Sequence, residues 1–192
     1  MISKGTEQLH CVPQLYSSPF GPDIISDATD CHAPEAELQL RNVSGRAFSA
    51  LGDCEAAARQ FRNAVRLAKA VYGQETLEFA STLENLSILC CECGRLFESE
   101  ATGIEAVSVF RKFKNGNELE LADALSHLAW TMHDLNNLRG AQLLYEEELE
   151  IRRQLNPNDD GDIAVALNNL ALVYEDQGKM TNAEPLYREA LA

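Results

Sequence analysis

The sequence predicts an all-α, right-handed solenoid of stacked helix–turn–helix units. Only 7% of the residues are aromatic, whereas alanine and leucine are abundant, a composition that favours helices over a β-sandwich. Apolar residues recur at helical spacing from about Pro34 onward. The chain also resembles itself when it is shifted by 42 positions, and such a period is typical of arrays in which each unit packs on its neighbours.

The repeat is clearest between residues 121–150 and residues 163–192. Eleven of these thirty aligned pairs are identical, from Ala122/Ala164 to Leu149/Leu191, where chance gives roughly two. Further shifts of 42 positions align weaker copies of the same pattern. We therefore predict four units, at approximately 37–78, 79–120, 121–162 and 163–192, the last of them incomplete.

Each unit is expected to hold two helices. In the last unit, Asp160 or Asp162 can cap a helix that runs to about Gln177, and Gly178 can form the turn after it. A second helix carries apolar residues three or four positions apart on one face: Ala183, Leu186, Tyr187, Ala190 and Leu191. No unit can bury both of its faces alone, so the units are expected to stack.

Residues 1–33 differ from the array that we expect over residues 34–192. The segment SSPFGPDIISDATDCHAP is rich in serine, proline, aspartate and glycine and lacks helical periodicity, which is typical of a flexible leader. The start of the chain, MISKGTEQLHCVPQLYSS, offers one lysine and no continuous apolar core, so it does not indicate a secretory signal.

The last unit resembles a tetratricopeptide repeat. The residues that carry the resemblance are Leu167, Leu170–Ala171, Tyr174, the turn residue Gly178, Ala183, Tyr187 and Ala190. The common form of that repeat is 34 residues long, but the 42-residue spacing with ALNNLALVYEDQGKMTNAEPLYREAL is similar to the kinesin-light-chain type. The resemblance implies an α-solenoid that acts as a protein-binding scaffold or adaptor.

The resemblance covers about 155 residues and weakens toward the N-terminus. Arg41 and Ser44 stand in the first unit where leucine is expected, and Gly103 replaces the aromatic residue of the second. Residues 1–40 contain no heptads of the kind that precede the repeats of kinesin light chains. Two alternatives therefore stay open: the sensor or oligomerisation arm of a larger signalling protein, and a kinesin-light-chain-type cargo adaptor.

Composition argues against several classes of partner. The formal net charge of −14 repels phosphate backbones and anionic lipids, so we expect neither a nucleic-acid nor a membrane partner. No apolar run approaches the roughly 20 residues that span a bilayer. Six cysteines without a secretory signal favour reduced thiols in the cytoplasm over a disulfide framework.

No residue pattern indicates catalysis, a metal site or a cofactor. His127 and His133 lie six positions apart on one predicted helix, about 240° around it, so they cannot bind one ion together. Cys90, Cys91 and Cys93 diverge too far on a helix to chelate a metal. The 42-residue overlay places Cys90 in the core and Cys91 toward the groove. A phosphate-binding GxxxxGK[ST] loop is absent from the sequence. We therefore expect a protein without enzymatic activity.

The charged segment YEEELEIRR, residues 145–153, has two interpretations. It can form a solvent-exposed helix face on which Glu148 and Arg152 pair at a spacing of four residues. It can also form an acidic docking patch for a basic partner. Charge runs are usual on exposed helices, so we favour the first interpretation.

The resemblance places the partner-binding groove on the first helices of the units. Three rows are expected to line it: Asn42, Glu84, Ser126 and Asn168; Arg46, Ile88, Trp130 and Leu172; and Ser49, Cys91, His133 and Glu175. Trp130 either anchors a ligand there or packs against the neighbouring helix, and both interpretations stay open. An apolar stripe flanked by amide and acidic groups suits a neutral or basic protein or peptide segment with apolar anchors.

The printed chain stops within the second helix of its best-matching unit. Solenoids need a polar capping helix, because their end face is otherwise apolar and exposed. We therefore expect either that the chain is a fragment of a longer array or that its open end self-associates.

Overall fold

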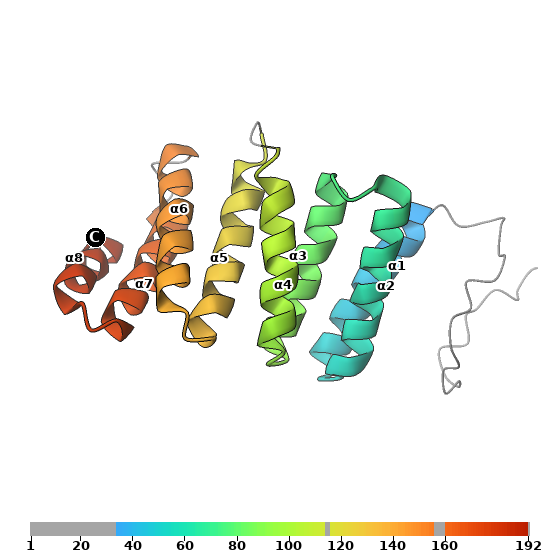
Figure 1. Cartoon of the computed structure of the whole chain (residues 1–192), viewed down its shortest axis with the longest axis horizontal. Helices are drawn as coiled ribbons and strands as arrows, with labels where there is room; N and C mark the ends of the chain where they lie inside the picture. The colour runs from blue at the N-terminus through green and yellow to red at the C-terminus, as the bar shows by residue number, and fades with distance from the viewer. Residues whose placement is uncertain (1–33, 114–115, 156–159, 192) are drawn as a thin grey trace, which may run out of the picture. The chain divides into compact units, whose positions relative to one another are not determined.

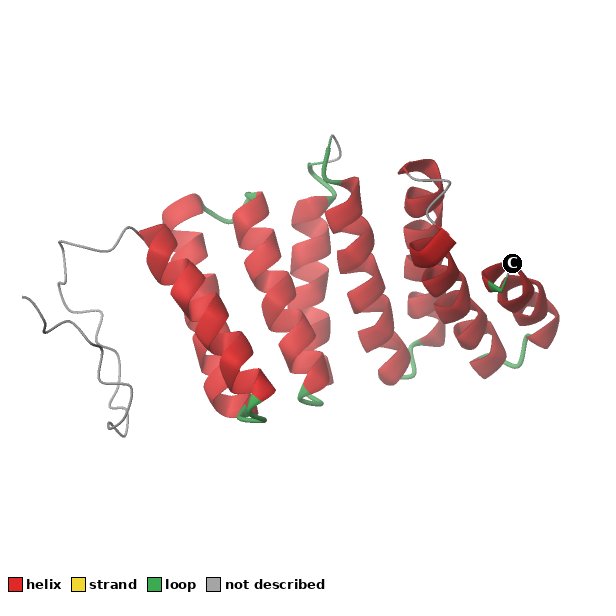
Figure 2. Ribbon diagram, turned by 180° about the vertical axis from the view of Figure 1, so that it is seen from behind, coloured by secondary structure: helices red, strands yellow, loops and turns green. Residues whose placement is uncertain are grey.

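The predicted all-α solenoid of helix–turn–helix repeats is confirmed. The computed structural model describes residues 34–113, 116–155 and 160–191, all of which belong to the compact unit formed by residues 32–192. These described residues form helices joined by short connections and contain no strand (Figure 1, Figure 2). The leader predicted over residues 1–33 lies outside the described residues.

Each hairpin pairs a first helix with a second, which we call its A helix and its B helix. The A helices are α1 (Pro34–Ala50), α3 (Leu77–Glu92), α5 (Glu118–Asp134) and α7 (Asp160–Asp176). The B helices are α2 (Cys54–Tyr72), α4 (Leu96–Phe110), α6 (Leu138–Leu155) and α8 (Met180–Ala190). Figure 1 shows these hairpins following one another in chain order.

The turn from A helix to B helix has the same geometry in each described hairpin. Its central residue has a positive φ, which is 77° at Gly52, 70° at Gly94, 60° at Asn136 and 73° at Gly178. The next amide then donates back to a carbonyl of the A helix, as Lys179 N does to Tyr174 O over 2.8 Å. Glycine adopts this left-handed conformation without a steric cost, and asparagine tolerates it. One reversal, repeated every 42 residues, therefore sets the hairpins.

Small residues let the two helices of a hairpin approach closely. Ala129 on α5 and Ala141 on α6 are fully buried, as are Ala171 on α7 and Ala183 on α8. Larger apolar residues fill the space between successive hairpins, and one cluster of buried residues runs from Leu38 on α1 to Leu128 on α5. Each hairpin is therefore stabilised mainly by the apolar area that it buries against its neighbours.

The first and second hairpins match the repeat pattern least well. In each of them, a large side chain lies against a glycine and uses the space beside it. In the first hairpin, a Cβ atom added to Gly45 would lie 2.7 Å from the Phe61 ring, so the aromatic side chain uses the space that a larger residue would need. In the second, a Cβ atom added to Gly103 would lie 3.1 Å from Leu128 of the next hairpin. Leu128 thus helps to fill the place of the missing aromatic side chain.

The A helices lie on the inner side of the stack. Helix α1 contacts α3, and α3 contacts α5, in addition to the contacts that each makes with B helices. The extensive contacts of the B helices, in contrast, are with A helices of their own hairpin and of the next. Because α1, α3 and α5 approach one another more closely than the B helices do, we take the exposed surface of the A helices as the concave one, as is usual in helical-repeat arrays.

The expectation of reduced thiols is wrong for Cys54 and Cys93, which form a disulfide. Cys54 begins α2 and Cys93 follows the last residue of α3, and stacking of the hairpins brings their Cα atoms to 5.9 Å. That separation is within the range that a disulfide spans. Among the described cysteines, Cys90 is a buried free thiol and Cys91 a partly exposed one.

Candidate functional site

The residues predicted to line a groove all lie on A helices, and none of them is buried. Arg46, Trp130, Asn168 and Glu175 are exposed, and the others are partly exposed: Asn42, Ser49, Glu84, Ile88, Cys91, Ser126, His133 and Leu172. We call the surface formed by these twelve residues the inner face. Trp130 is 46% exposed, which is high for an aromatic side chain this large.

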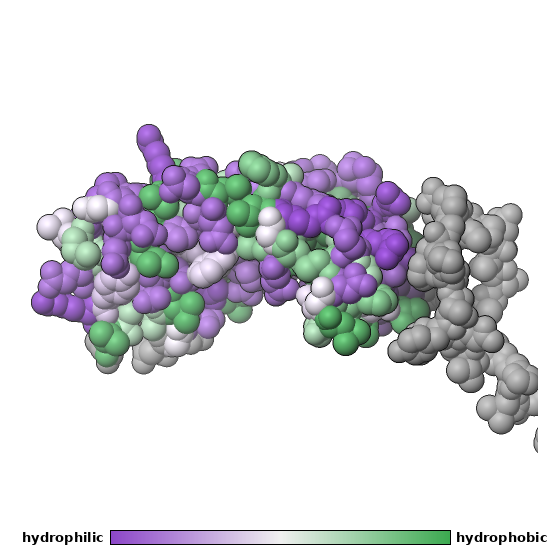
Figure 3. Space-filling model, turned by 90° about the horizontal axis from the view of Figure 1, so that it is seen from below, coloured by the Kyte–Doolittle hydropathy of each residue, from purple (hydrophilic) through white to green (hydrophobic). Residues whose placement is uncertain are grey.

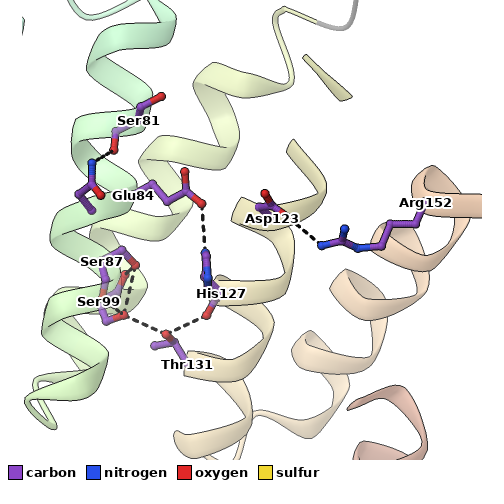
Figure 4. Close-up of polar contacts among 9 residues, drawn as sticks. Ser81, Glu84, Ser87, Ser99, Asp123, His127, Thr131 and Arg152 are labelled. Atoms are coloured by element: carbon purple, nitrogen blue, oxygen red, sulfur yellow. Dashed lines mark hydrogen bonds and ion pairs between the residues drawn. The ribbon is translucent and has the colours of Figure 1, made fainter. Parts of the chain in front are cut away.

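Polar side chains connect neighbouring A helices across the inner face. Nδ1 of His127 on α5 lies 3.0 Å from Oε1 of Glu84 on α3 (Figure 4). Farther along the stack, Nε2 of His133 on α5 lies 2.6 Å from Oδ2 of Asp176 on α7. At the N-terminal side, the Ser49 hydroxyl lies 3.2 Å from a carboxylate oxygen of Glu92, to which it donates.

These three contacts share a sequence separation of 43 residues, one more than the repeat length. The rows predicted from the sequence align equivalent positions, 42 residues apart, and therefore omit one partner of each contact: Glu92, His127 and Asp176. Complementary polar residues separated by 43 positions are the signal that would have identified all three.

An apolar stripe runs between these polar contacts. Trp130 is its largest member, and Ile88 and Leu172 stand at the equivalent positions of α3 and α7. The ring centroids of Trp130 and His133 are 6.5 Å apart with an interplanar angle of 48°, so the imidazole borders the indole without stacking on it. With 46% of its surface exposed, Trp130 is accessible to a ligand.

A chain of buried hydroxyl groups lies beneath the inner face (Figure 4). The Ser87 hydroxyl on α3 donates to the Ser99 carbonyl on α4 over 2.9 Å. The Ser99 hydroxyl is 2.9 Å from that of Thr131 on α5, which donates to the backbone carbonyl of His127 over 3.1 Å. This chain ties the A helix that carries Trp130 to the preceding hairpin, because buried hydroxyl groups are costly to leave unpaired.

The solvent-exposed interpretation of residues 145–153 is wrong for Glu148, which is 1% exposed. Its expected partner is confirmed: Arg152 Nε donates to Glu148 Oε1 over 2.8 Å. Arg152 also donates to Asp123 on α5 over 2.7 Å (Figure 4) and to Asp162 on α7 over 2.8 Å. Burial raises the pKa of the Glu148 carboxyl above its ordinary value, against the opposing effect of Arg152.

The B helices carry a second set of ion pairs, on the outer side of the stack. Arg111, which directly follows α4, pairs with Glu147 on α6 at 2.6 Å, and the equivalent Arg153 on α6 pairs with Glu189 on α8. All four side chains are substantially exposed, so each pair contributes little to stability. On the face seen in Figure 3, hydrophilic side chains separate small groups of apolar ones.

The described residues offer neither a metal-binding cluster nor a membrane-spanning helix. No group of three or more histidine, cysteine, aspartate or glutamate side chains within them could hold a metal ion. No helix within the same residues has the length and apolar character needed to cross a membrane.

Comparison with known families identifies the repeats. Residues 78–154 match one model of the tetratricopeptide repeat, and residues 163–192 match a second model with the same description. Together the matched segments make up more than half of the chain. The chain belongs to the tetratricopeptide-repeat family. Its first hairpin lies outside the matched segments, which agrees with the weak repeat pattern there. No curated protein sequence matches the chain.

Several solved structures are similar to this tetratricopeptide-repeat protein in fold. BtubC (BKLC) from P. vanneervenii has a TM-score of 0.76 at 20% identity, over 83% of this chain and 64% of BtubC. The nearly identical TPR-like repeats of a candidate kinesin light chain from Podosopora anserina give 0.71 at 16% identity, over 82% and 74%. Aspartyl phosphate phosphatase F from Bacillus subtilis gives 0.71 at 15%, over 82% and 40%. The chain thus spans less than two thirds of the length of BtubC, and the likeness to kinesin-light-chain repeats is one of fold.

Proposed function

We propose that this protein is an interaction scaffold whose inner face binds an extended or helical segment of a protein partner. Concave surfaces of helical-repeat arrays are suited to such ligands, since they present side chains from several units along one direction. The observation that carries the proposal is the half-exposed Trp130 on the central A helix α5. A large aromatic residue exposed in the middle of a concave surface is the type of side chain that dominates binding energy at protein interfaces.

The charges of the inner face favour a neutral or basic segment. Glu84, Glu175 and Asp176 supply carboxylates along α3 and α7, whereas Arg46 is the one arginine in the three predicted rows. Histidine partners neutralise some of these carboxylates only when protonated. A basic ligand is therefore attracted, and its affinity is expected to fall as salt rises.

The experiment selects peptides from a displayed random twelve-residue library on the wild-type chain. Trp130→Ala is expected to weaken binding of the selected peptides at least tenfold, because a buried aromatic anchor is lost. The matched control is Leu143→Ala on α6, a B-helix residue that is 57% exposed, and it should leave binding unchanged. Far-ultraviolet circular dichroism checks that both variants keep their helices.

Two outcomes contradict the proposal. One is a set of selected peptides that binds Trp130→Ala and wild type equally. The other is selection of acidic peptides whose affinity does not change with salt, which would place the binding surface elsewhere.

We also propose self-association through the α7–α8 hairpin. Val165 and Leu191 are 58% and 88% exposed there and help to line a cavity of about 440 Å³. The residue equivalent to Leu191 in the preceding hairpin, Leu149, is buried among residues of α7. On α1, Leu40 is 64% exposed, whereas its equivalent Ala166 is buried. We propose that α1 of a second copy packs there, because each interior junction of the stack pairs the B helix of one hairpin with the A helix of the next.

Sedimentation velocity of the wild-type chain over a hundredfold range of concentration tests this second proposal. Head-to-tail contacts do not close into a ring, so further copies add as the concentration rises and the sedimentation coefficient increases. Leu191→Glu should abolish the rise, and Leu143→Glu on α6 is the matched control. A constant monomeric coefficient in wild type would rule it out.

A further inference from the structure

The disulfide joins the first hairpin to the second. Cys54 is the first residue of α2, and Cys93 follows α3. Both sulfur-bearing residues are partly exposed, so a small thiol can reach them. The bond therefore connects two structural units that otherwise hold together by packing and a few polar contacts.

The equivalent junctions farther along the stack are not covalent. The same separation of 39 residues links Leu96 with Leu135, and Leu138 with Gln177. At the latter, the Gln177 side-chain amide donates to the Leu138 carbonyl over 3.0 Å. At this position of the repeat, the first junction has a disulfide, the second has two leucines and the third has a hydrogen bond.

Packing holds the first helix of the first hairpin weakly. Helix α1 buries only Leu38 and Gly45, and it carries Arg41 and Ser44 where later A helices have leucine. The equivalent helix α5 buries seven residues. Because apolar burial is the main source of stability in a stack, α1 is held less firmly by packing than α5.

The two free thiols of the same segment cannot readily open the bond. Burial raises the pKa of the Cys90 thiol to about 12, and burial also raises the pKa of Cys91. Only the thiolate attacks a disulfide, so these cysteines are poor nucleophiles at neutral pH. Cleavage therefore requires an external reductant.

We infer that the Cys54–Cys93 disulfide is a redox-cleavable clamp that holds the first hairpin, and its part of the inner face, against the rest of the stack. An external dithiol cleaves it: one thiolate attacks a cysteine sulfur and displaces the other cysteine as thiolate. The second thiol of the reagent then attacks the mixed disulfide. Two electrons pass to the protein, which ends with two thiols, and the reagent ends as its own disulfide.

The clamp acts on ligand binding through α1, and this step rests on the proposed function. Helix α1 contributes Asn42, Arg46 and Ser49 to the inner face. Ser49 donates to Glu92, the residue immediately before Cys93. When the clamp opens, α1 and α2 are expected to open more often, and the arginine of the inner face is displaced with them.

Hydrogen exchange of the full chain, with and without dithiothreitol, tests the clamp directly. Reduction is expected to speed amide exchange in α1 and α2 at least tenfold and to leave α5 to α8 unchanged. Cys54→Ser should show the fast exchange under both conditions. Cys91→Ser, a matched change that keeps the disulfide, should behave as wild type. Reducing the wild-type chain keeps the test valid even if Cys54→Ser folds poorly.

Two results overturn the clamp: equal exchange of α1 and α2 in both redox states, or an intact mass that does not rise by two hydrogens on reduction. The binding step is tested with selected peptides whose affinity is weakened by Arg46→Ala, and reduction should weaken them at least fivefold. Unchanged affinity with faster exchange would refute control of binding while confirming the clamp. A library that yields no peptides would refute the proposed function, and the exchange experiment would still decide the clamp.

Discussion

His133 on α5 and Asp176 on α7 meet across the inner face, with 2.6 Å between Nε2 and Oδ2. Asp176 keeps 45% of its side chain exposed, so water and salt screen the interaction. The pair therefore contributes to the relative position of α5 and α7 but adds little to stability.

A double-mutant cycle measures this contribution. For His133→Ala and Asp176→Ala we expect a coupling free energy of about 0.2–1 kcal/mol, the range of exposed pairs. The control pairs His133→Ala with Asp123→Ala, ten positions away on α5 and so about 15 Å distant by helical rise. Its coupling should be within about 0.5 kcal/mol of zero. A coupling above about 2 kcal/mol at His133 would show that the pair is a major source of stability.

Asn136 is the one described residue other than glycine with a positive φ, 60°. Glycine adopts this conformation with less strain, so Asn136→Gly should raise the free energy of unfolding by about 0.5 kcal/mol, and Asn136→Ala should lower it by about 1 kcal/mol. Urea titrations followed by circular dichroism measure both. Gly94→Ala is the matched change at the equivalent turn, where an added Cβ meets no atom within 4 Å, and it should cost about 1.5 kcal/mol, the sum of those two differences.

Gly45 and Phe61 share one space in the first hairpin. Gly45→Ala forces the new Cβ against the ring and should lower the free energy of unfolding by about 1–3 kcal/mol, the usual cost of overpacking. Phe61→Leu in the same chain should restore part of the loss, since it removes the atoms that clash. Thermal unfolding checks both variants, and Gly45→Ala with wild-type stability would refute the close packing of α1 on α2.

Two glutamates predict opposite dependences of stability on pH. Burial raises the pKa of Glu148 above 4.5 in the folded state, so its ionisation opposes folding, and stability falls as pH rises from 4.5 through the raised pKa. The hydrogen bond from Arg62 lowers the pKa of Glu98 below 4.5. Its contribution is therefore present above 4.5 and is lost as pH falls through the lowered pKa.

Unfolding free energies of wild type, Glu148→Gln and Glu98→Gln between pH 3 and pH 7 measure these contributions. The unfolding free energy of Glu148→Gln, relative to wild type, should increase as pH rises above 4.5. That of Glu98→Gln, relative to wild type, should increase as pH falls below 4.5. If both differences changed in the same direction with rising pH, the assigned pKa shifts would be contradicted.

Most of the fold could be predicted from the repeat, because residues 42 positions apart occupy equivalent places in successive hairpins. Leu170, Ala171 and Ala183 are buried as the motif requires, and the turn residues Gly52, Gly94 and Gly178 share one backbone conformation. What the repeat could not show is how neighbouring hairpins meet, since those contacts fall at other separations.

Three features illustrate that limit. The disulfide joins residues 39 apart, the polar contacts of the inner face join residues 43 apart, and Glu148 is buried although its segment is highly charged. Each depends on the rotation and offset from one hairpin to the next, which a self-alignment does not contain. Unburied positions on the A helices could be predicted from the repeat, but the partners of their side chains could not.

The buried hydroxyl chain of Ser87, Ser99 and Thr131 distinguishes one junction from the others. At the positions of Ser87 and Ser99, the other hairpins have Gly45 with Ala57, Ala129 with Ala141, and Ala171 with Ala183. Where α5 has Thr131, the other A helices have Ala47, Leu89 and Val173. The hairpins are therefore not interchangeable. If α7 packed against α4 in place of α5, the contact between the Ser99 and Thr131 hydroxyl groups would be lost. One specific polar contact, as well as connectivity, thus favours α5 as the neighbour of α4.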